Sequence, residues 1–171
     1  MLAQLRTAIR DSLPPKLVHA YRVMRHTLLW PTELEMAAAR QFLSPETTAV
    51  DVGANFGIFT SVLARHSKKV VAFEPNPTCA RHLRIVAPPN CEIIAKAVSD
   101  ELGVSTLRVP VGSGVAMDAL ATIAASNLFD SESRATEAFI HSVETTTLDD
   151  VLLSPETSRA RRFHQHRCRG S

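Results

Sequence analysis

The most constraining feature of this sequence is a regular alternation of short apolar strands and helices around one glycine-containing turn. The strands are expected at residues 48–52, 69–73 and 91–98, and the helices at residues 58–66 and 76–86. The turn, residues 53–57, joins the first strand directly to the first helix. Strand, helix, strand, helix, strand over about fifty residues predicts βαβ units and a parallel sheet.

The pattern is weaker on either side of this alternation. Before it, helices are expected at residues 2–13, 16–29 and 32–43; after it, extended segments at 104–109 and 140–147 and a short helix at 148–153, capped by Thr147. We therefore divide the chain into N-terminal helices (1–31), a partial α/β domain (32–158) and a basic tail (159–171), which we expect to be disordered or out of frame.

Composition excludes several classes of protein. The chain has 171 residues, 45% of them hydrophobic and 21% charged, which excludes collagen-like and coiled-coil chains and argues against wholesale disorder. No apolar run reaches the length of a membrane span, and the N-terminus is a poor signal peptide. Cys79, Cys91 and Cys168 have no metal-ligand spacing, so we expect reduced thiols, no metal and a cytoplasmic location.

The positive net charge comes from the C-terminal end of the chain. The net charge of +2 includes five arginines in the last thirteen residues, which contain no acid: Arg159, Arg161, Arg162, Arg167 and Arg169. Without them, 14 Lys and Arg face 17 Asp and Glu, a balance of −3. A nucleic-acid partner would depend on this tail alone, and none is expected.

Residues 1–30 form basic amphipathic segments. In the second of them, Leu17, Tyr21, Met24 and Leu28 share one helical face, while the opposite face carries cations. Such a helix can lie on a membrane surface. We favour the alternative that its apolar face packs on the domain and its basic face is solvated.

The turn at residues 53–57 has the character of a nucleotide-binding site. Asp51 precedes it, Gly53 and Gly57 permit a close backbone approach, and the following helix N-terminus offers free amides. Glu74 ends the second strand, twenty-one residues after Gly53, where an acid can accept hydrogen bonds from ribose hydroxyls.

The residues of the turn favour a cationic ligand over a pyrophosphate. Asn55 stands where the dinucleotide fingerprint has its second glycine, and the Asp51 carboxylate would repel a pyrophosphate. S-adenosylmethionine carries an ammonium and a sulfonium and no phosphate. It is the expected cofactor, and an NAD-dependent oxidoreductase is a less favoured alternative.

The segments D-V-G-A-N-F-G (51–57) and F-E-P-N-P (73–77) resemble the FkbM-type methyltransferases, a branch of the class I S-adenosylmethionine-dependent enzymes. A-V-S-D (97–100) and T-T-L-D-D (146–150) support the resemblance, which covers roughly residues 33–153. It implies a Rossmann-like α/β fold, a parallel sheet with helices on both faces. It also implies methyl transfer to an oxygen of a sugar, glycolipid or secondary metabolite, so the expected partner is a small-molecule or glycan hydroxyl.

The resemblance also implies roles for individual residues. The loop around the methionine part of the cofactor is matched by Asp51, Gly53, Ala54, Asn55 and Gly57. Glu74 matches the ribose-binding acid, and Ser99 and Asp100 lie where the loop after the third strand meets adenine. No residue is assigned as a catalytic base.

The family's next strand, with a pattern like I-[KN]-I-D-V-E-G, is missing, and so are the C-terminal strands that would complete the sheet. Shifting the codons of residues 164–171 by one base permits Ile-Asn-Ile-Asp-Val-Glu-Gly, so we expect a frameshift near residue 160. The chain is then a methyltransferase fragment without activity. The alternatives are a natural basic tail and a non-catalytic nucleotide-binding remnant.

Overall fold

The computed structural model describes residues 13–29, 34–112, 115, 116, 121, 123 and 137–153. Along the chain these residues form α2 (Pro15–Leu29), α3 (Leu34–Phe42), β1 (Thr48–Val52), α4 (Ile58–His66), β2 (Lys69–Phe73), α5 (Pro77–Val86), β3 (Cys91–Ile94), β4 (Ala97–Val98), β5 (Gly103–Gly112), β6 (Val115–Ala116), β7 (Glu137–Thr146) and α7 (Leu148–Leu153). Residues 2–12 of the expected helix at 2–13 lie outside the described residues, and so does the basic tail.

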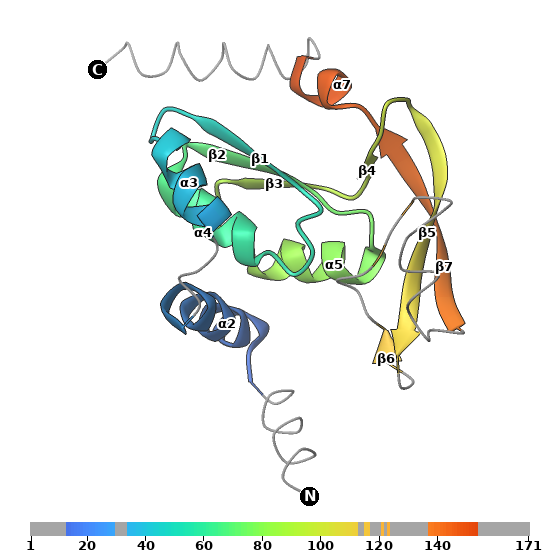
Figure 1. Ribbon diagram of the computed structural model, residues 1–171, viewed down its shortest axis with the longest axis horizontal. Coiled ribbons are helices and arrows are strands. Elements are labelled where there is room, and N and C mark those ends of the chain that lie inside the picture. The colour runs from blue at the N-terminus through green and yellow to red at the C-terminus, as the bar shows by residue number, and fades with distance from the viewer. Residues whose placement is uncertain are drawn as a thin grey trace, which may run out of the picture.

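The first sheet is parallel, with the strand order β1-β2-β3. Ala49, Val70 and Cys91 are neighbours across it and point to one face. On that face Leu63 of α4 and Leu83 of α5 pack against the strands, so both crossover helices cover the same side (Figure 1). This confirms the predicted α/β class and parallel sheet.

The start of α5 and the start of α7 follow from local sequence. The Asn76 side chain accepts a hydrogen bond from the Thr78 amide at 3.0 Å, and Pro77 occupies the first turn. In the same way, the Thr147 hydroxyl accepts from the Asp150 amide at 3.0 Å. Both helices begin where the sequence predicts, because each cap satisfies an amide that the first turn leaves free.

The predicted third strand, residues 91–98, is wrong as a single element. β3 pairs with β2 only as far as Ile94, the neighbour of Phe73. Phe73 is the last residue of β2, and after it the chain turns toward α5, so no partner strand remains for the residues after Ile94. Ala97 and Val98 instead pair in parallel with Thr145 and Thr146 of β7.

The second sheet has the strand order β4-β7-β5-β6 and is dominated by a long antiparallel ribbon of β5 and β7. The predicted extended segments at 104–109 and 140–147 belong to these two strands, which are longer than the sequence indicated. The core of this sheet consists of Ala97, Leu107, Val109 and Val143, with Ala121 and Ile123 against it. It is separate from the core under the first sheet.

Helix α2 packs on α4 and α5, but not through its apolar face. Its buried residues are His19 and Val23, 5% and 1% exposed. The side chains of Leu17, Tyr21 and Met24 are instead half exposed or more. The expected packing of these three residues on the domain is therefore wrong, because the surface offered by α4 and α5 at this point is polar and aromatic.

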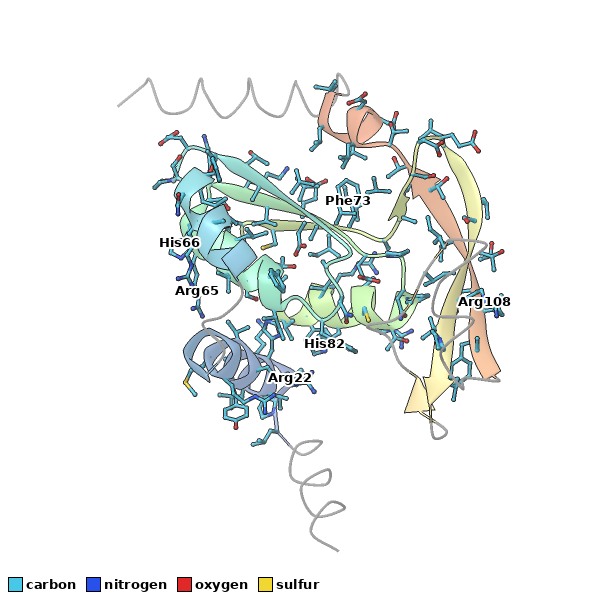
Figure 2. All side chains as sticks on the ribbon, viewed as in Figure 1. Arg22, Arg65, His66, Phe73, His82 and Arg108 are labelled. Carbon is cyan, nitrogen blue, oxygen red and sulfur yellow. The ribbon has the colours of Figure 1, made fainter. Side chains whose placement is uncertain are left out.

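Histidine and aromatic contacts join α2 to the domain. The His19 Nε2 and Ser61 Oγ atoms are 2.8 Å apart, and the His19 and His82 rings meet edge to face at 5.9 Å. His82 also contacts Phe56, over which the Arg22 guanidinium lies at 5.9 Å; Figure 2 shows Arg22 on the side of α2 toward His82. The pKa of each histidine is lowered, mainly by burial and also by the Arg22 charge.

Two independent features of the structure make a glycine important at position 57. Its φ is +82°, and a Cβ atom at this position would overlap the Leu83 side chain of α5. We predict that Gly57→Ala lowers the free energy of unfolding by about 2–4 kcal/mol, from backbone strain and overpacking together. Urea denaturation measures this loss.

The matched control for that substitution is Gly103→Ala. Gly103 has no positive φ, and its nearest neighbour for a Cβ atom, Thr145 Oγ1, would be at an ordinary 3.6 Å. This variant should stay within about 1 kcal/mol of wild type. Equal stability of the two variants would contradict the packing described for Gly57.

The histidine contact predicts that stability depends on pH. Because the folded pKa values of His19 and His82 are lowered, the unfolded chain binds more protons around pH 6. The contribution of this contact is complete above the ordinary histidine pKa of about 6.5 and is lost as the pH falls below it. Urea denaturation between pH 8 and pH 5 should show this decrease in wild type.

The double variant His19→Gln/His82→Gln should flatten that part of the profile. His66→Gln, which changes an exposed histidine at the end of α4, should keep the wild-type slope. If the double variant retained the full decrease, the two buried histidines would not be its source.

Candidate functional site

The candidate site begins at the carboxyl end of β1, where the five residues 53–57 form the turn that leads into α4. Gly53, Asn55 and Gly57 all have a positive φ, at +78°, +50° and +82°. The Gly53 and Ala54 amides donate to the Phe73 carbonyl at 2.9 and 3.0 Å, which fixes the turn to the end of β2. The predicted turn thus lies against the second strand, as the expected site requires.

Gly53 and Gly57 serve different purposes in this turn. Gly57 makes room for α5, whereas a Cβ atom on Gly53 would meet no atom within 4 Å. The side of Gly53 where a side chain would stand is therefore open. A ligand can approach the backbone there, which is the usual reason for glycine in a binding loop.

Glu74 holds the two loops of the site together. One carboxylate oxygen, Oε2, accepts from the Asn55 amide at 2.6 Å, and the other, Oε1, accepts from the Asn76 amide at 2.8 Å. The side chain is almost fully buried, with 5% of its surface exposed. Charge-assisted hydrogen bonds of this kind are stronger than neutral ones. Glu74 thus has a positioning role that its place at the strand end did not reveal.

Asp51 lies beneath the turn and is partly buried. The Thr60 hydroxyl of α4 donates to Asp51 Oδ2 at 2.6 Å. Burial raises the pKa of Asp51, while the hydrogen bond from Thr60 acts in the opposite direction. The structure therefore brings Asp51, Gly53 to Gly57 and Glu74 to one edge of the sheet. Their contact with a cofactor stays a prediction.

Ser99 and Asp100 have a different setting. They follow β4, and their contacts are with one another and with the second sheet: Ser99 Oγ donates to Asp100 Oδ1 at 3.0 Å, and the Ser99 amide donates to the Thr146 carbonyl at 2.9 Å. The hydrogen bond of Ser99 thus attaches this loop to β7, not to the turn at residues 53–57. Their contact with adenine stays a prediction.

Two polar side chains of the site were not found by sequence reasoning. Thr60 supports Asp51, and the Cys79 thiol of α5 lies 3.5 Å from the Asn55 side-chain oxygen. Thr60 and its neighbour Ser61 are both buried in α4, and nothing in the sequence distinguishes the one that supports Asp51. For Cys79 no pattern in the sequence points to Asn55, because the contact depends on how α5 returns beside the turn.

Among the residues that the structure describes, no group of three His, Cys, Asp or Glu side chains could hold a metal ion. Neither Cys79 nor Cys91 is in a disulfide, and burial, together with the Asp51 charge, raises the pKa of Cys91 to about 11. No helix in this part of the chain is long and apolar enough to cross a membrane.

The parallel sheet, the glycine turn after β1 and the acid after β2 define a Rossmann-like α/β protein of the nucleotide-binding type. Comparison with known families gives the particular family. The model of the methyltransferase FkbM domain matches residues 51–162, and the chain belongs to this family. S-adenosylmethionine is the cofactor of this methyltransferase family.

Two individual proteins are similar to parts of the chain. A probable ribosomal RNA small subunit methyltransferase A from Methanosarcina mazei is 40% identical over 73 residues, which are 42% of this chain and 27% of the relative. An rRNA methylase from Streptococcus thermophilus, known as a crystal structure, is 27% identical over 39% of this chain and 43% of its own, with a TM-score of 0.34. The chain thus spans about a quarter of the length of the curated relative.

The two hydrogen bonds to Glu74 predict a loss of stability when its charge is removed. In Glu74→Gln only one side-chain oxygen remains, so one of the Asn55 and Asn76 amides faces an NH₂ group. We predict that the free energy of unfolding falls by about 1–3 kcal/mol without any ligand present. Urea denaturation of the variant measures this.

Glu92→Gln is the control, because Glu92 is an exposed acid that pairs with Lys69 on the surface of the same sheet. Exposed pairs of this kind contribute about 0–1 kcal/mol. If Glu74→Gln were no less stable than Glu92→Gln, the carboxylate would not hold the loops.

Proposed function

We propose that this chain is the cofactor-binding part of an S-adenosylmethionine-dependent methyltransferase that acts on an oxygen of a sugar, glycolipid or secondary metabolite. The observation that carries the proposal is the open side of Gly53, in a turn that follows Asp51 and is held by Glu74 through the Asn55 amide. The turn leaves space for a ligand at the edge of the sheet where both acids lie.

The residues of the turn suit the parts of this cofactor. Asp51 precedes Gly53 by two residues, and a carboxylate at this end of β1 favours an ammonium or sulfonium group over a phosphate. Glu74 follows β2 at the same edge of the sheet, and a carboxylate oxygen is a suitable acceptor for a ribose hydroxyl. Ala54, Asn55 and Gly57 complete the loop around the methionine part.

When bound, the cofactor supplies a methyl group on a sulfonium, which an acceptor oxygen attacks in line. The contribution we assign to this chain is positioning: Glu74 fixes the loop, and the loop fixes the ligand. No described residue is assigned the role of the base that takes the acceptor's proton.

The same site argues against the alternative of an oxidoreductase. A pyrophosphate beside Gly53 would lie close to Asp51, and residues 51–57 contain no Lys or Arg to balance its charge. A non-catalytic remnant that keeps the pocket is the remaining alternative from another class, and an assay of methyl transfer separates it from an enzyme.

RNA is a second candidate acceptor. The observation that favours it is the 40% identity over 73 residues with a relative whose name gives ribosomal RNA as its substrate. That match covers only 27% of the relative. It therefore supports a likeness of the shared segment more than a likeness of the methyl acceptor. Incubation with radiolabelled S-adenosylmethionine and, separately, RNA or a glycolipid fraction distinguishes the two acceptors.

Calorimetric titration tests the placement of the cofactor. We predict that the chain binds S-adenosylmethionine and not NAD, and that Gly53→Val abolishes binding. In Gly53→Asn the side chain tolerates a positive φ, so the fold is retained while the open space is filled. This variant should also lose binding, by about tenfold or more.

Gly103→Asn is the matched control, since it adds the same side chain at a glycine outside the site and should bind like wild type. Normal affinity in folded Gly53→Asn would show that the pocket lies elsewhere. Tight binding of NAD would overturn the choice of cofactor.

A further inference from the structure

The turn at residues 53–57 is attached to the rest of the molecule in two different ways. Its first three residues donate backbone hydrogen bonds to the end of β2 and to the Glu74 carboxylate. Phe56, the next residue, is instead in contact through its side chain, which is half-buried. The conformation of the second half of the turn therefore depends on the side chains that surround this ring.

Two helices supply the contacts of the Phe56 ring. The His82 ring of α5 meets it edge to face, with the ring centroids 5.4 Å apart and an angle of 79° between the planes. The Arg22 guanidinium of α2 lies over the ring, 5.9 Å from its centroid. A cation is attracted to this position because the face of an aromatic ring is electron-rich. The ring is thus held by a helix on each of two sides.

The charge of Arg22 is compatible with its neighbour His82. Figure 2 shows the two side chains in the same region, between α2 and α5. The pKa of His82 is lowered, first by burial and then by the Arg22 charge, so this imidazole is mostly neutral at neutral pH. It therefore does not repel the guanidinium from the Phe56 ring.

His19 attaches α2 at the place where the turn becomes α4. Its Nε2 atom is 2.8 Å from Ser61 Oγ, and the Ser61 amide donates to the Gly57 carbonyl at 3.0 Å. A Cβ atom on Gly57 would lie 3.7 Å from His19 Cε1. Arg22 follows His19 by three residues, so it lies on the same side of α2 and reaches Phe56, which precedes Gly57.

Helix α2 lies outside the segment that the family model matches. That segment is residues 51–162, whereas α2 ends at Leu29. Membership of the family therefore does not by itself supply the contact between Arg22 and Phe56. The contact belongs to this chain.

We propose that Arg22 is a positioning residue for the turn: it holds the Phe56 ring and thereby fixes the half of the turn that Glu74 does not reach. The inference rests on the proposed function, in which this turn binds S-adenosylmethionine. A loop that already has its bound conformation loses less entropy when the ligand arrives, so a fixed turn binds more tightly. Arg22 acts through the ring and needs no contact with the cofactor.

Calorimetric titration of the whole chain with S-adenosylmethionine tests the proposal. Arg22→Ala should weaken binding about three- to fivefold, because the turn gains freedom that the ligand must then remove. Arg22→Lys should bind within about twofold of wild type, since an ammonium group also binds the face of a ring. Arg84→Ala is the matched control: Arg84 is exposed in the last turn of α5, and this variant should bind like wild type.

A double-mutant cycle tests whether Arg22 acts through the ring. Phe56→Leu removes the ring but keeps an apolar side chain, and it should weaken binding by about the same factor as Arg22→Ala. In the Phe56→Leu background, Arg22→Ala should add less than about 1.5-fold. The full loss in that background would mean that Arg22 acts elsewhere, for example on the cofactor itself, and would overturn the positioning role.

Amide NMR spectra without ligand separate this inference from the proposed function. Arg22→Ala should shift the Phe56 and Gly57 amides, whereas Arg84→Ala should leave them in place, and circular dichroism confirms that each variant is folded. If wild type bound no S-adenosylmethionine, the proposed function would fail, but these shifts would still support the hold of Arg22 on the turn. Unchanged amides, or wild-type affinity in folded Arg22→Ala, would overturn this inference alone.

Discussion

The Glu74 carboxylate is the interaction on which the arrangement of the site depends. Glu74 directly follows β2 and accepts hydrogen bonds from the amides of Asn55 and Asn76, one in each of the two loops that follow neighbouring strands. Without it, a turn with three positive φ values would have two buried amides less well satisfied at its edge. The acid of the second strand therefore shapes the pocket before any ligand is bound, and loss of affinity in a Glu74 variant need not mean loss of a ribose contact.

The turn after β1 and the surface of α2 differ in chemistry. At the carboxyl ends of β1 and β2, the side of Gly53 where a side chain would stand is open, and Asp51 and Glu74 are hydrogen-bonded at the base of the turn and at its edge. Helix α2 is attached to the domain through His19 and turns Leu17, Tyr21 and Met24 outward.

Much of the fold was predictable because its signals are local. The strands at 48–52 and 69–73 and the helix after Asn76 follow from apolar runs and a cap that depend only on neighbouring residues. The break after Ile94 was not predictable, since it depends on where β2 ends in space.

The side of α2 that packs on the domain was also predicted wrongly. Amphipathic spacing identifies the apolar face of a helix, but it does not show whether the domain offers an apolar surface to that face. In the candidate site, the sequence placed Asp51, Gly53 and Glu74 at the ends of the first two strands, whereas the hydrogen bonds of Glu74 and the support of Asp51 by Thr60 required the structure.

We propose that the cofactor binds at the turn from Gly53 to Gly57. An amide-resolved NMR titration with S-adenosylmethionine tests this placement most directly, because each amide of the turn gives a separate signal. We predict that the largest saturable shifts occur at Gly53, Ala54 and Asn55 and at Glu74, and that NAD causes none of them. Shifts confined to the second sheet or to α2, or equal shifts with NAD, would contradict it.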